Sequence, residues 1–371
     1  GQVQPALRTA SENLTHEIRD MRLAFGEEIR RGEWSDIDKL PKIMGGLTRL
    51  QEHLDALADQ LNVASVRSKG LESCFKRAED LENELKMILE DNSGKWVKWF
   101  EVHRKSFSLS LTPLDIASEF SQFMALQKAS WVFTSATLSV DNKFEHFSRN
   151  LGLSQAKSYS WESPFDFQKQ SLFYHPKGLP MPNEANFVDE IVKVALPVIN
   201  ASKGRTFFLF TSHRALKRAA ELLEDNVDYP LLVQGDKPKA ILLDDFKQMG
   251  NAVLLGTASF WEGIDVRGEA LSTVIIDKLP FAMPSDPVLK ARLAEMTKKG
   301  LNSFMNHQLP SAVIALRQGV GRLIRDEDDS GVLLICDPRL LKKSYGHAFL
   351  NSLPNMRRTR DIKDVEEFFC G

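Results

Sequence analysis

The sequence has few cysteines, no excess of charge and no long apolar run, and each absence narrows what the protein can be. Its three cysteines, Cys74, Cys336 and Cys370, are odd in number and lie far apart without C-x-x-C spacing, so neither a disulfide framework nor a metal site is indicated. The formal net charge is −2, so any binding to nucleic acid must come from a local patch. No apolar run reaches the ~18 residues of a membrane span, and residues 1–7 lack the charged and apolar regions of a signal peptide. We therefore expect a cytoplasmic protein without a membrane partner.

The amino-terminal part of the chain predicts helices. A chain of 371 residues with 43% hydrophobic content can bury a large core, and ordinary domain sizes predict two or three domains. Over residues 6–91 apolar residues recur at helical spacing among many charges, and strand formers are few. The clearest apolar stripe has spacings of three and four: Leu47, Leu50, Leu54, Leu57 and Leu61. This part predicts a helical bundle with solvated faces, and it shows no catalytic motif.

The pattern changes between residues 95 and 138. Phe107, Leu109 and Leu111 alternate with serines, which predicts a strand, and a helix is expected over 114–128. The aromatic and basic run 95–105 either packs in a core or stacks bases along a DNA track. A buried strand at 131–134 is then expected to run into Thr-Ser-Ala-Thr-Leu, residues 134–138. Short hydroxyl residues at the carboxyl end of a strand lie where open α/β sheets place their ligands.

From Ser171 onward, short apolar strands alternate with helical patterns. Continuous apolar runs are typical of strands that are covered on both faces of a parallel sheet. The predicted fold class of this half is therefore a doubly wound α/β domain, with strands expected at 172–174, 206–210, 231–233, 252–255, 271–276 and 332–336.

The loop after the strand ending at Leu255 carries polar signals. Its residues 256–265 read Gly-Thr-Ala-Ser-Phe-Trp-Glu-Gly-Ile-Asp. Gly256 and Gly263 allow close backbone approach, and Asp265 is able to accept hydrogen bonds from a ribose or an arginine. Thr257 and Ser259 are candidate donors to DNA phosphates. A capped turn between a strand and a helix is the alternative reading of this loop.

The segment Gln318–Arg325 reads Gln-Gly-Val-Gly-Arg-Leu-Ile-Arg and follows an apolar helical run. If the helix continues, Arg322 and Arg325 share one face at i and i+3. They then form a charged fork that suits a polyphosphate, as an arginine finger does. The alternatives are a solvated helix face or half of a dinucleotide fingerprint, and the latter lacks its third glycine.

These four segments, 134–138, 206–212, 256–265 and 318–325, resemble motifs III to VI of superfamily 2 helicases, in the same order. The forms Phe-Trp-Glu-Gly-Ile-Asp and Gln-x-x-Gly-Arg-x-x-Arg are similar to those of the DinG and XPD branch, in particular its bacterial YoaA-like members. The resemblance implies a mostly helical Arch-like domain over 1–128. It implies the motif III strand and the tail of a first motor domain over 129–170, and a second RecA-like domain over 171–371.

The resemblance also shows what is missing. No G-x-x-x-x-G-K-[ST] loop, Asp-Glu-x-His box or four-cysteine cluster motif occurs in the chain, so we expect a truncated sequence that starts within the Arch and is inactive as an ATPase by itself. In the full-length protein the resemblance implies ATP and Mg²⁺ as cofactors. The resemblance also allows an iron–sulfur cluster in a segment that precedes this sequence, and no cluster is expected within the sequence itself. Single-stranded DNA and ATP are the implied partners, together with replication or repair proteins.

The resemblance assigns roles to individual residues. Arg322, Arg325 and Gln318 are the implied catalytic residues, and Glu262, Gly263 and Asp265 contact the nucleotide. Thr211, Ser212, Thr257 and Ser259 bind DNA, and Ser135 and Thr137 couple the nucleotide state to the grip on DNA.

The implied function is ATP-driven translocation on single-stranded DNA, 5′ to 3′ in the family, in repair or replication. Two rival classes stay open. A non-hydrolysing binding or regulatory module would explain the missing Walker motifs, and a Walker loop encoded upstream of Gly1 would exclude it. A dinucleotide-dependent oxidoreductase would need a G-x-G-x-x-G after its first strand.

Overall fold

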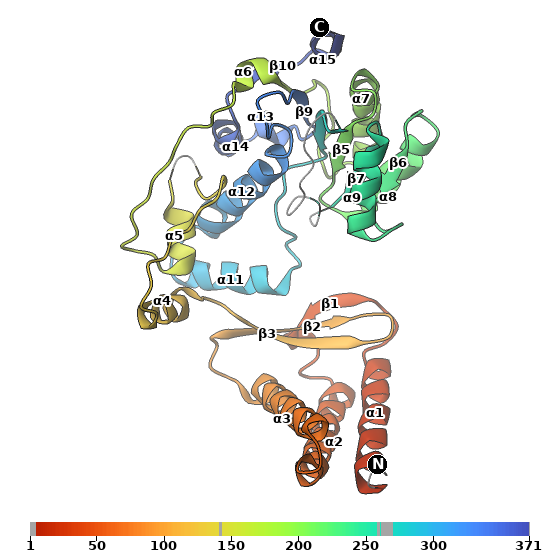
Figure 1. Cartoon of the computed structure of the whole chain (residues 1–371), viewed down its shortest axis with the longest axis vertical. Coiled ribbons are helices and arrows are strands. Elements are labelled where there is room, and N and C mark those ends of the chain that lie inside the picture. The colour runs from red at the N-terminus through yellow and green to blue at the C-terminus, as the bar shows by residue number, and fades with distance from the viewer. Residues whose placement is uncertain (1–4, 141–142, 258–259, 261–269, 371) are drawn as a thin grey trace. The chain divides into compact units, whose positions relative to one another are not determined.

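The computed structural model describes residues 5–140, 143–257, 260 and 270–370. The chain divides into two compact units (Figure 1). The first unit contains the residues up to 116 together with 283–301, and the second contains 117–282 and 302–371. This division differs from the linear one expected at 128 and 170, because helix α11 (Pro287–Lys298) leaves the α/β part of the chain and packs with the first unit.

The first unit is mostly helical, as predicted. Helix α2 packs against both α1 and α3, and its predicted stripe is buried through Leu47, Leu50, Leu54 and Leu61. Ser68 begins α3 because its hydroxyl accepts a hydrogen bond from the backbone N–H of Leu71. The bounds of the helical elements are α1 Pro5–Ala24, η1 Trp34–Asp36, α2 Pro41–Ser65 and α3 Lys69–Glu90.

A small antiparallel sheet completes this unit, in the order β1 (Arg30–Glu33), β2 (Trp96–Val102), β3 (Phe107–Pro113). Phe100 points into the core shared with α1 and α2 and is fully buried. Trp99 lies under the guanidinium of Arg31, 3.8 Å from its ring centre, and donates a hydrogen bond to Thr112. Two of the aromatic residues considered for base stacking therefore have partners within the protein.

The second unit is built on a parallel sheet of seven strands in the order β10-β4-β9-β8-β5-β7-β6. The six predicted strands are present within one or two residues at each end. The edge strand β10 was not predicted, because its three residues are largely exposed and form no apolar run. The strands are β4 Ser171–Tyr174, β5 Thr206–Leu209, β6 Leu231–Val233, β7 Val253–Gly256, β8 Thr273–Ile276, β9 Gly331–Ile335 and β10 Arg357–Thr359.

Helices cover both faces of this sheet, which explains the continuous apolar strands. Phe207 and Leu209 pack in a core with Phe246, Val313 and Leu316 from α9 and α12, whereas Phe208 and Phe210 pack on the opposite face with residues of α7 and α8. Successive strand residues point to opposite faces, so both must be apolar. The predicted doubly wound fold is confirmed. The helical elements are α4 Ala117–Leu126, α5 Glu145–Leu151, α6 Phe167–Gln170, α7 Phe187–Ala201, α8 His213–Glu224, α9 Lys239–Met249, η3 Phe304–Gln308, α12 Leu309–Val320, α13 Arg339–Lys342, α14 Gly346–Ser352 and α15 Ile362–Cys370.

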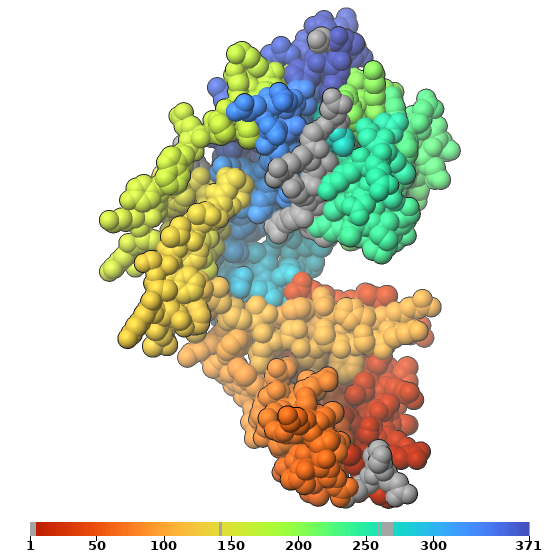
Figure 2. All heavy atoms as spheres, viewed as in Figure 1, coloured from red at the N-terminus to blue at the C-terminus, as the bar shows by residue number. Residues whose placement is uncertain are grey.

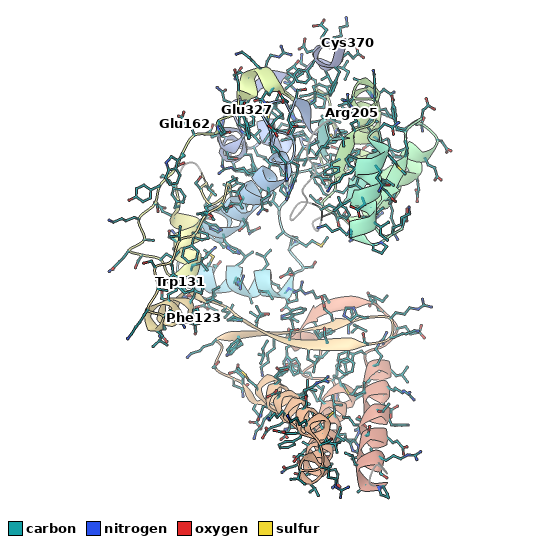
Figure 3. All side chains as sticks on the ribbon, viewed as in Figure 1. Phe123, Trp131, Glu162, Arg205, Glu327 and Cys370 are labelled. Carbon is teal, nitrogen blue, oxygen red and sulfur yellow. The ribbon has the colours of Figure 1, made fainter. Side chains whose placement is uncertain are left out.

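The strand expected at 131–134 is wrong. Those residues form no strand, and Val132 is 83% exposed. Trp131 instead packs beside Phe123 of α4, with ring centres 6.0 Å apart, and stacks with Phe133 (Figure 3). A strand needs neighbours to accept and donate its ladder hydrogen bonds, and no described strand pairs with these residues.

The segment that continues from there runs along the surface of the second unit, where Figure 2 shows it in yellow to yellow-green. Tyr159 and Trp161 are exposed there at 65% and 82%. Within the described ranges, no helix combines the length and the apolar content that crossing a bilayer requires.

Candidate functional site

Polar residues follow the strands of the parallel sheet at their carboxyl ends. Because the strands are parallel, these residues share one edge of the sheet. We call this group the carboxyl-end cluster: Thr211 after β5, Gln234 after β6, Thr257 after β7, Asp277 after β8 and Asp337 after β9. Two of the residues predicted for DNA binding, Thr211 and Thr257, are thereby brought to the same edge.

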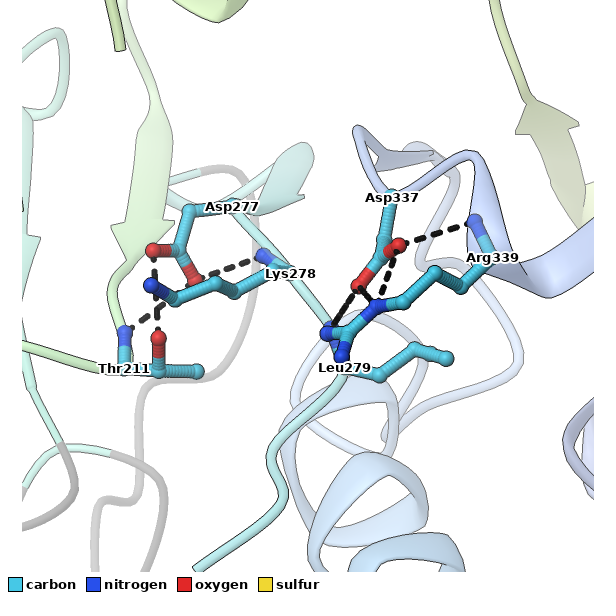
Figure 4. A network of polar contacts seen from close by, with 6 residues as sticks. All are labelled: Thr211, Asp277, Lys278, Leu279, Asp337 and Arg339. Atoms are coloured by element: carbon cyan, nitrogen blue, oxygen red, sulfur yellow. Dashed lines mark hydrogen bonds and ion pairs between the residues drawn. The ribbon is translucent and has the colours of Figure 1, made fainter. Parts of the chain in front are cut away.

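Thr211 is held by Asp277 (Figure 4). The carboxylate of Asp277 accepts hydrogen bonds from the Thr211 backbone N–H at 3.1 Å and from its hydroxyl at 3.3 Å, and another from the backbone N–H of Lys278 at 2.6 Å. Asp277 is completely buried. Burial raises its pKa to about 7, although these donors and the Lys278 charge favour the ionised form. The loop that contains Thr211 is therefore hydrogen-bonded to a carboxyl group whose charge changes near neutral pH.

Asp337 holds the chain that follows Asp277. Its buried carboxylate accepts a hydrogen bond from the backbone N–H of Leu279 at 2.8 Å, and it pairs with the guanidinium of Arg339 at 2.6 Å. Arg339 also lies over the ring of Phe281, 5.5 Å from its centre. These contacts fix residues 279–281 against the sheet edge.

Ser212 and Thr257 have structural partners within the cluster. The Ser212 hydroxyl accepts from the backbone N–H of Ala215 and so caps helix α8. Thr257 is 6% exposed, and both its backbone N–H and its hydroxyl donate to Oε1 of Gln234, at 2.6 and 3.0 Å. Its hydroxyl also lies 3.5 Å from Nε2 of His213. Thr257 therefore links the ends of β5, β6 and β7.

Close backbone approach occurs at Gly256, as the sequence suggested. A Cβ at this position would meet the Phe260 side chain at 2.7 Å, so only glycine fits beside that buried ring. The predicted site residues Ser259, Glu262, Gly263 and Asp265 lie outside the described residues.

The helix expected to carry both arginines is wrong. Helix α12 ends at Val320, and residues 321–325 form a turn. Gly321 follows the helix with its N–H bonded to the carbonyl of Arg317. Arg322 and Arg325 are half-buried in this turn, so the i, i+3 argument does not describe their geometry. Gln318 is half-buried within the last turn of α12. A pair of glycines near a helix end favours termination over continuation.

The arginine turn, residues 321–329, is fixed by hydrogen bonds to Asp329 within it and from Gln170 outside it. Asp329 Oδ2 accepts from the backbone N–H groups of Arg325 and Asp326, at 2.8 and 2.9 Å. The side-chain amide of Gln170 donates to three carbonyls of the turn, those of Asp326, Glu327 and Asp329. The backbone at Arg325 is therefore held in place without help from a helix.

This turn lies at the amino ends of the strands, the edge opposite the carboxyl-end cluster. Gln170 immediately precedes β4, and the turn runs directly into β9 at Gly331. The structure therefore does not bring the arginines together with Thr211 and Thr257.

Ser135 and Thr137 form a hydroxyl-stabilised turn. The backbone N–H of Thr137 donates to Oγ of Ser135 at 3.2 Å, and the two hydroxyl oxygens are 3.3 Å apart. Arg317 of α12 reaches this segment: its Nη1 donates to the Ser139 carbonyl at 2.6 Å, and its Nη2 to the Ala136 carbonyl at 3.0 Å. The predicted coupling residues thus connect to the helix that leads into the arginine turn.

Sequence reasoning missed Gln170, Gln234, Asp277, Asp329 and Arg317. Asp277 could have been found by the rule used for Thr257, since it directly follows a buried strand. Gln170 and Arg317 carry no such signal, because their partners lie far away in the chain. Asp329 does not follow a strand either, and its partners are the backbone N–H groups of Arg325 and Asp326. Over the residues that the structure describes, no three His, Cys, Asp or Glu side chains are placed to hold a metal ion.

Comparison with known proteins gives the family. A model of the helicase C-terminal domain matches residues 195–356. The chain is 42% identical over 363 residues to the ATP-dependent DNA helicase YoaA of Haemophilus influenzae, covering 98% of this chain and 57% of that protein. It is 33% identical over 276 residues to the ATP-dependent helicase DinG of Mycobacterium tuberculosis, covering 73% of this chain and 41% of the relative. The chain thus spans little more than half the length of the first relative and less than half of the second.

The fold has solved counterparts. A structure titled XPD_APO aligns with a TM-score of 0.64 at 15% identity, covering 96% of this chain and 71% of the other. At that identity the likeness concerns the fold. The motifs in their order, the match of the domain model and the 42% identity agree, and the chain belongs to the YoaA and DinG family of helicases, with an XPD-like fold.

Proposed function

We propose that this chain is part of an ATP-dependent DNA helicase that translocates on single-stranded DNA, 5′ to 3′, in repair or replication. The observation that carries the proposal is the pair of separate sites on one parallel sheet. Hydroxyl residues gather at the carboxyl ends of the strands, and the arginine turn is fixed at the amino ends. A motor needs one surface for its track and another for its nucleotide.

The carboxyl-end cluster is the proposed DNA surface. Thr211 and Ser212 open the loop before α8, and Thr257 is tied to the same edge through Gln234. Backbone N–H groups and hydroxyls at such an edge suit phosphate oxygens, whose contacts carry no sequence information. Thr257 contributes through the loop it shapes, because its own hydroxyl already donates to Gln234. Ser259 belongs to the same proposed surface.

The arginine turn is the proposed nucleotide surface. Arg325, with Arg322, stabilises charge on the transferring phosphoryl group, and Gln318 at the helix end helps to position them. Glu262, Gly263 and Asp265 are proposed to contact the nucleotide as well.

The chemistry of the residues fits a phosphate better than a metal. Two half-buried guanidinium groups suit the oxygens of a polyphosphate. When bound, ATP and Mg²⁺ supply the phosphoryl group and the neutralisation of its charge. We assign Mg²⁺ no ligand among the described residues, because none of them form a suitable acidic group. The proposal has three further parts. The complete protein carries any iron–sulfur cluster outside this sequence, it works with repair or replication proteins, and it is located in the cytoplasm.

The test compares this chain with the complete gene product. We expect phosphate release in the presence of single-stranded DNA from the complete protein and none from this chain alone, which lacks a phosphate-binding loop. Turnover by the chain above ~0.1 per second, below the usual enzyme range of ~1 to 1000 per second, would contradict the assignment of these segments. Tight DNA binding without hydrolysis by the complete protein would instead indicate a binding module.

A further inference from the structure

Arg317 makes an unusual set of contacts at the end of helix α12. Its Nη1 donates to the Ser139 carbonyl at 2.6 Å and to the Ser139 hydroxyl at 3.2 Å. Its Nη2 donates to the Ala136 carbonyl at 3.0 Å. The Ala136 carbonyl belongs to the Ser135–Thr137 turn and the Ser139 carbonyl lies two residues beyond it, so one guanidinium ties the turn to the segment that follows.

The guanidinium suits this task better than other side chains. Two carbonyls three residues apart need two donors that diverge from a rigid plane, and the arginine fork provides them. A lysine ammonium is a single point charge on a flexible stem, and it does not hold both carbonyls in one fixed geometry.

Burial of this guanidinium carries a desolvation cost. Arg317 is half-buried, and the partners that the structure records for it are carbonyls and a hydroxyl, which carry no charge. Burial lowers the pKa of its guanidinium. Placing a cation away from water without an opposite charge is unfavourable, and an apolar residue of similar size is often neutral or stabilising in such a place. The positive charge at this position is therefore explained better by a role in function than by a contribution to folding stability.

We propose that Arg317 is a positioning residue that fixes the Ser135–Thr137 turn to helix α12. Gln318 is its neighbour in sequence, and Arg322 follows five residues later in the arginine turn. A shift of this helix end on contact with nucleotide therefore moves the Ser135–Thr137 turn with it. The contact itself stands on the structure, and its role in coupling rests on the proposed function.

The first experiment uses this chain and the Arg317→Met variant. We expect the backbone amides of Thr137 and Val140, which donate to Ser135 Oγ and to the Lys143 carbonyl, to exchange hydrogen about tenfold faster in the variant. The melting temperature is expected to stay equal or to rise. Arg149→Met is the control, because Arg149 donates to the side chain of Asn306 and not to this turn. Unchanged exchange at both amides overturns the proposal.

The second experiment measures coupling in the complete gene product. Arg317→Met should raise the ATP consumed per base pair separated by about fivefold or more, with DNA affinity within about twofold, and Arg317→Lys should lie between the variant and the natural protein. Faster exchange together with an unchanged ratio overturns the coupling role. A natural protein without ATP hydrolysis refutes the proposed function, while the exchange experiment still decides whether Arg317 holds the turn.

Discussion

The two units of this chain differ in where they keep their polar groups. In the first unit the ion pairs of the described residues are largely at the surface, such as Arg31 with Asp286, whose side chains are 37% and 27% exposed. Among the described buried polar residues, Glu17 alone belongs to that unit. The second unit contains all the others, namely Ser171, His175, Ser202, Thr206, Thr257, Ser272, Thr273, Asp277 and Asp337.

This difference indicates where substitutions should cost the most stability. Surface pairs can change at little cost because water replaces the lost partner. A buried carboxyl such as Asp277 has no such replacement, so its neighbours must be arranged around it. We therefore expect substitutions at the polar residues of the second unit to have large effects, and those at surface pairs of the first unit to have small ones.

The largest expected effect is at Arg325. In the complete gene product, Arg325→Ala should lower ATP turnover by ~10³-fold or more, as loss of an arginine finger does, and leave affinity for single-stranded DNA within a few-fold. Lysine should not restore it fully, since it lacks the planar fork. Phosphate release measures the ATP turnover of the variant, and titration with single-stranded DNA measures its affinity.

Thr257→Val provides the opposite case. It removes the hydroxyl that donates to Gln234 and should weaken DNA binding equally for different sequences, with turnover at saturating DNA little changed. If Arg325→Ala lost DNA binding and kept turnover, the roles assigned to the two sheet edges would be wrong.

The next largest effect concerns Asp277 and pH. Its pKa rises from 3.8 to about 7 in the folded state, so folding retains a proton that the unfolded chain loses. This contribution to stability is complete below about pH 4 and is lost as pH rises through 7. It corresponds to roughly 3 to 4 kcal/mol. Urea unfolding of the second unit between pH 4.5 and 7.5 measures it.

Asp277→Asn should remove most of this pH dependence, because the amide oxygen still accepts from Thr211 and Lys278 and has no proton to lose. Asp244→Asn, at an exposed position on α9, is the matched control and should follow the natural protein. Identical pH profiles for the natural chain and Asp277→Asn would show that Asp277 is ionised throughout.

A smaller effect is expected at Asp329, which touches neither ligand in our proposal. Asp329→Ala removes the acceptor for the backbone N–H groups of Arg325 and Asp326, and we expect turnover of the complete gene product to fall about tenfold through misplacement of Arg325. Asp328→Ala, one residue away and exposed, should leave turnover unchanged. Equal loss in both variants would point to the net charge of the turn and not to its geometry.

The smallest effect is expected in the first unit. Arg31→Ala breaks its pair with Asp286 and its contact with Trp99, yet each is partly exposed, so the loss should be about 1 kcal/mol or less. Hydrogen exchange of the β1–β2 amides measures it. A loss of more than about 3 kcal/mol would show that this surface pair behaves like the buried groups of the second unit.

Much of the fold followed from local pattern. The stripe through Leu47, Leu50 and Leu54 could only be a buried helix face, and the apolar runs of the second unit had to be covered on both sides. The segment 131–134 has the same composition as those strands and forms none. Pairing depends on neighbours, and composition does not specify them.

The candidate site was predictable in its parts and not in its arrangement. The motifs identified Thr211, Thr257, Arg322 and Arg325 as residues worth attention. They did not reveal that the helix ends at Val320, or that the hydroxyl cluster and the arginine turn occupy opposite edges of the sheet.

The sequence by itself determined six of the strands of the second unit, the helical character of the first and the family of the chain. These rest on periodicity and on residues close together in the chain. Only the tertiary structure decided that α11 packs with the first unit, that Gln170 holds the arginine turn and that Arg317 bonds the carbonyls of Ala136 and Ser139. The contacts of Gln170 and Arg317 join residues up to 181 positions apart, and hydrogen bonding across that separation depends on how the packed elements orient their donors and acceptors.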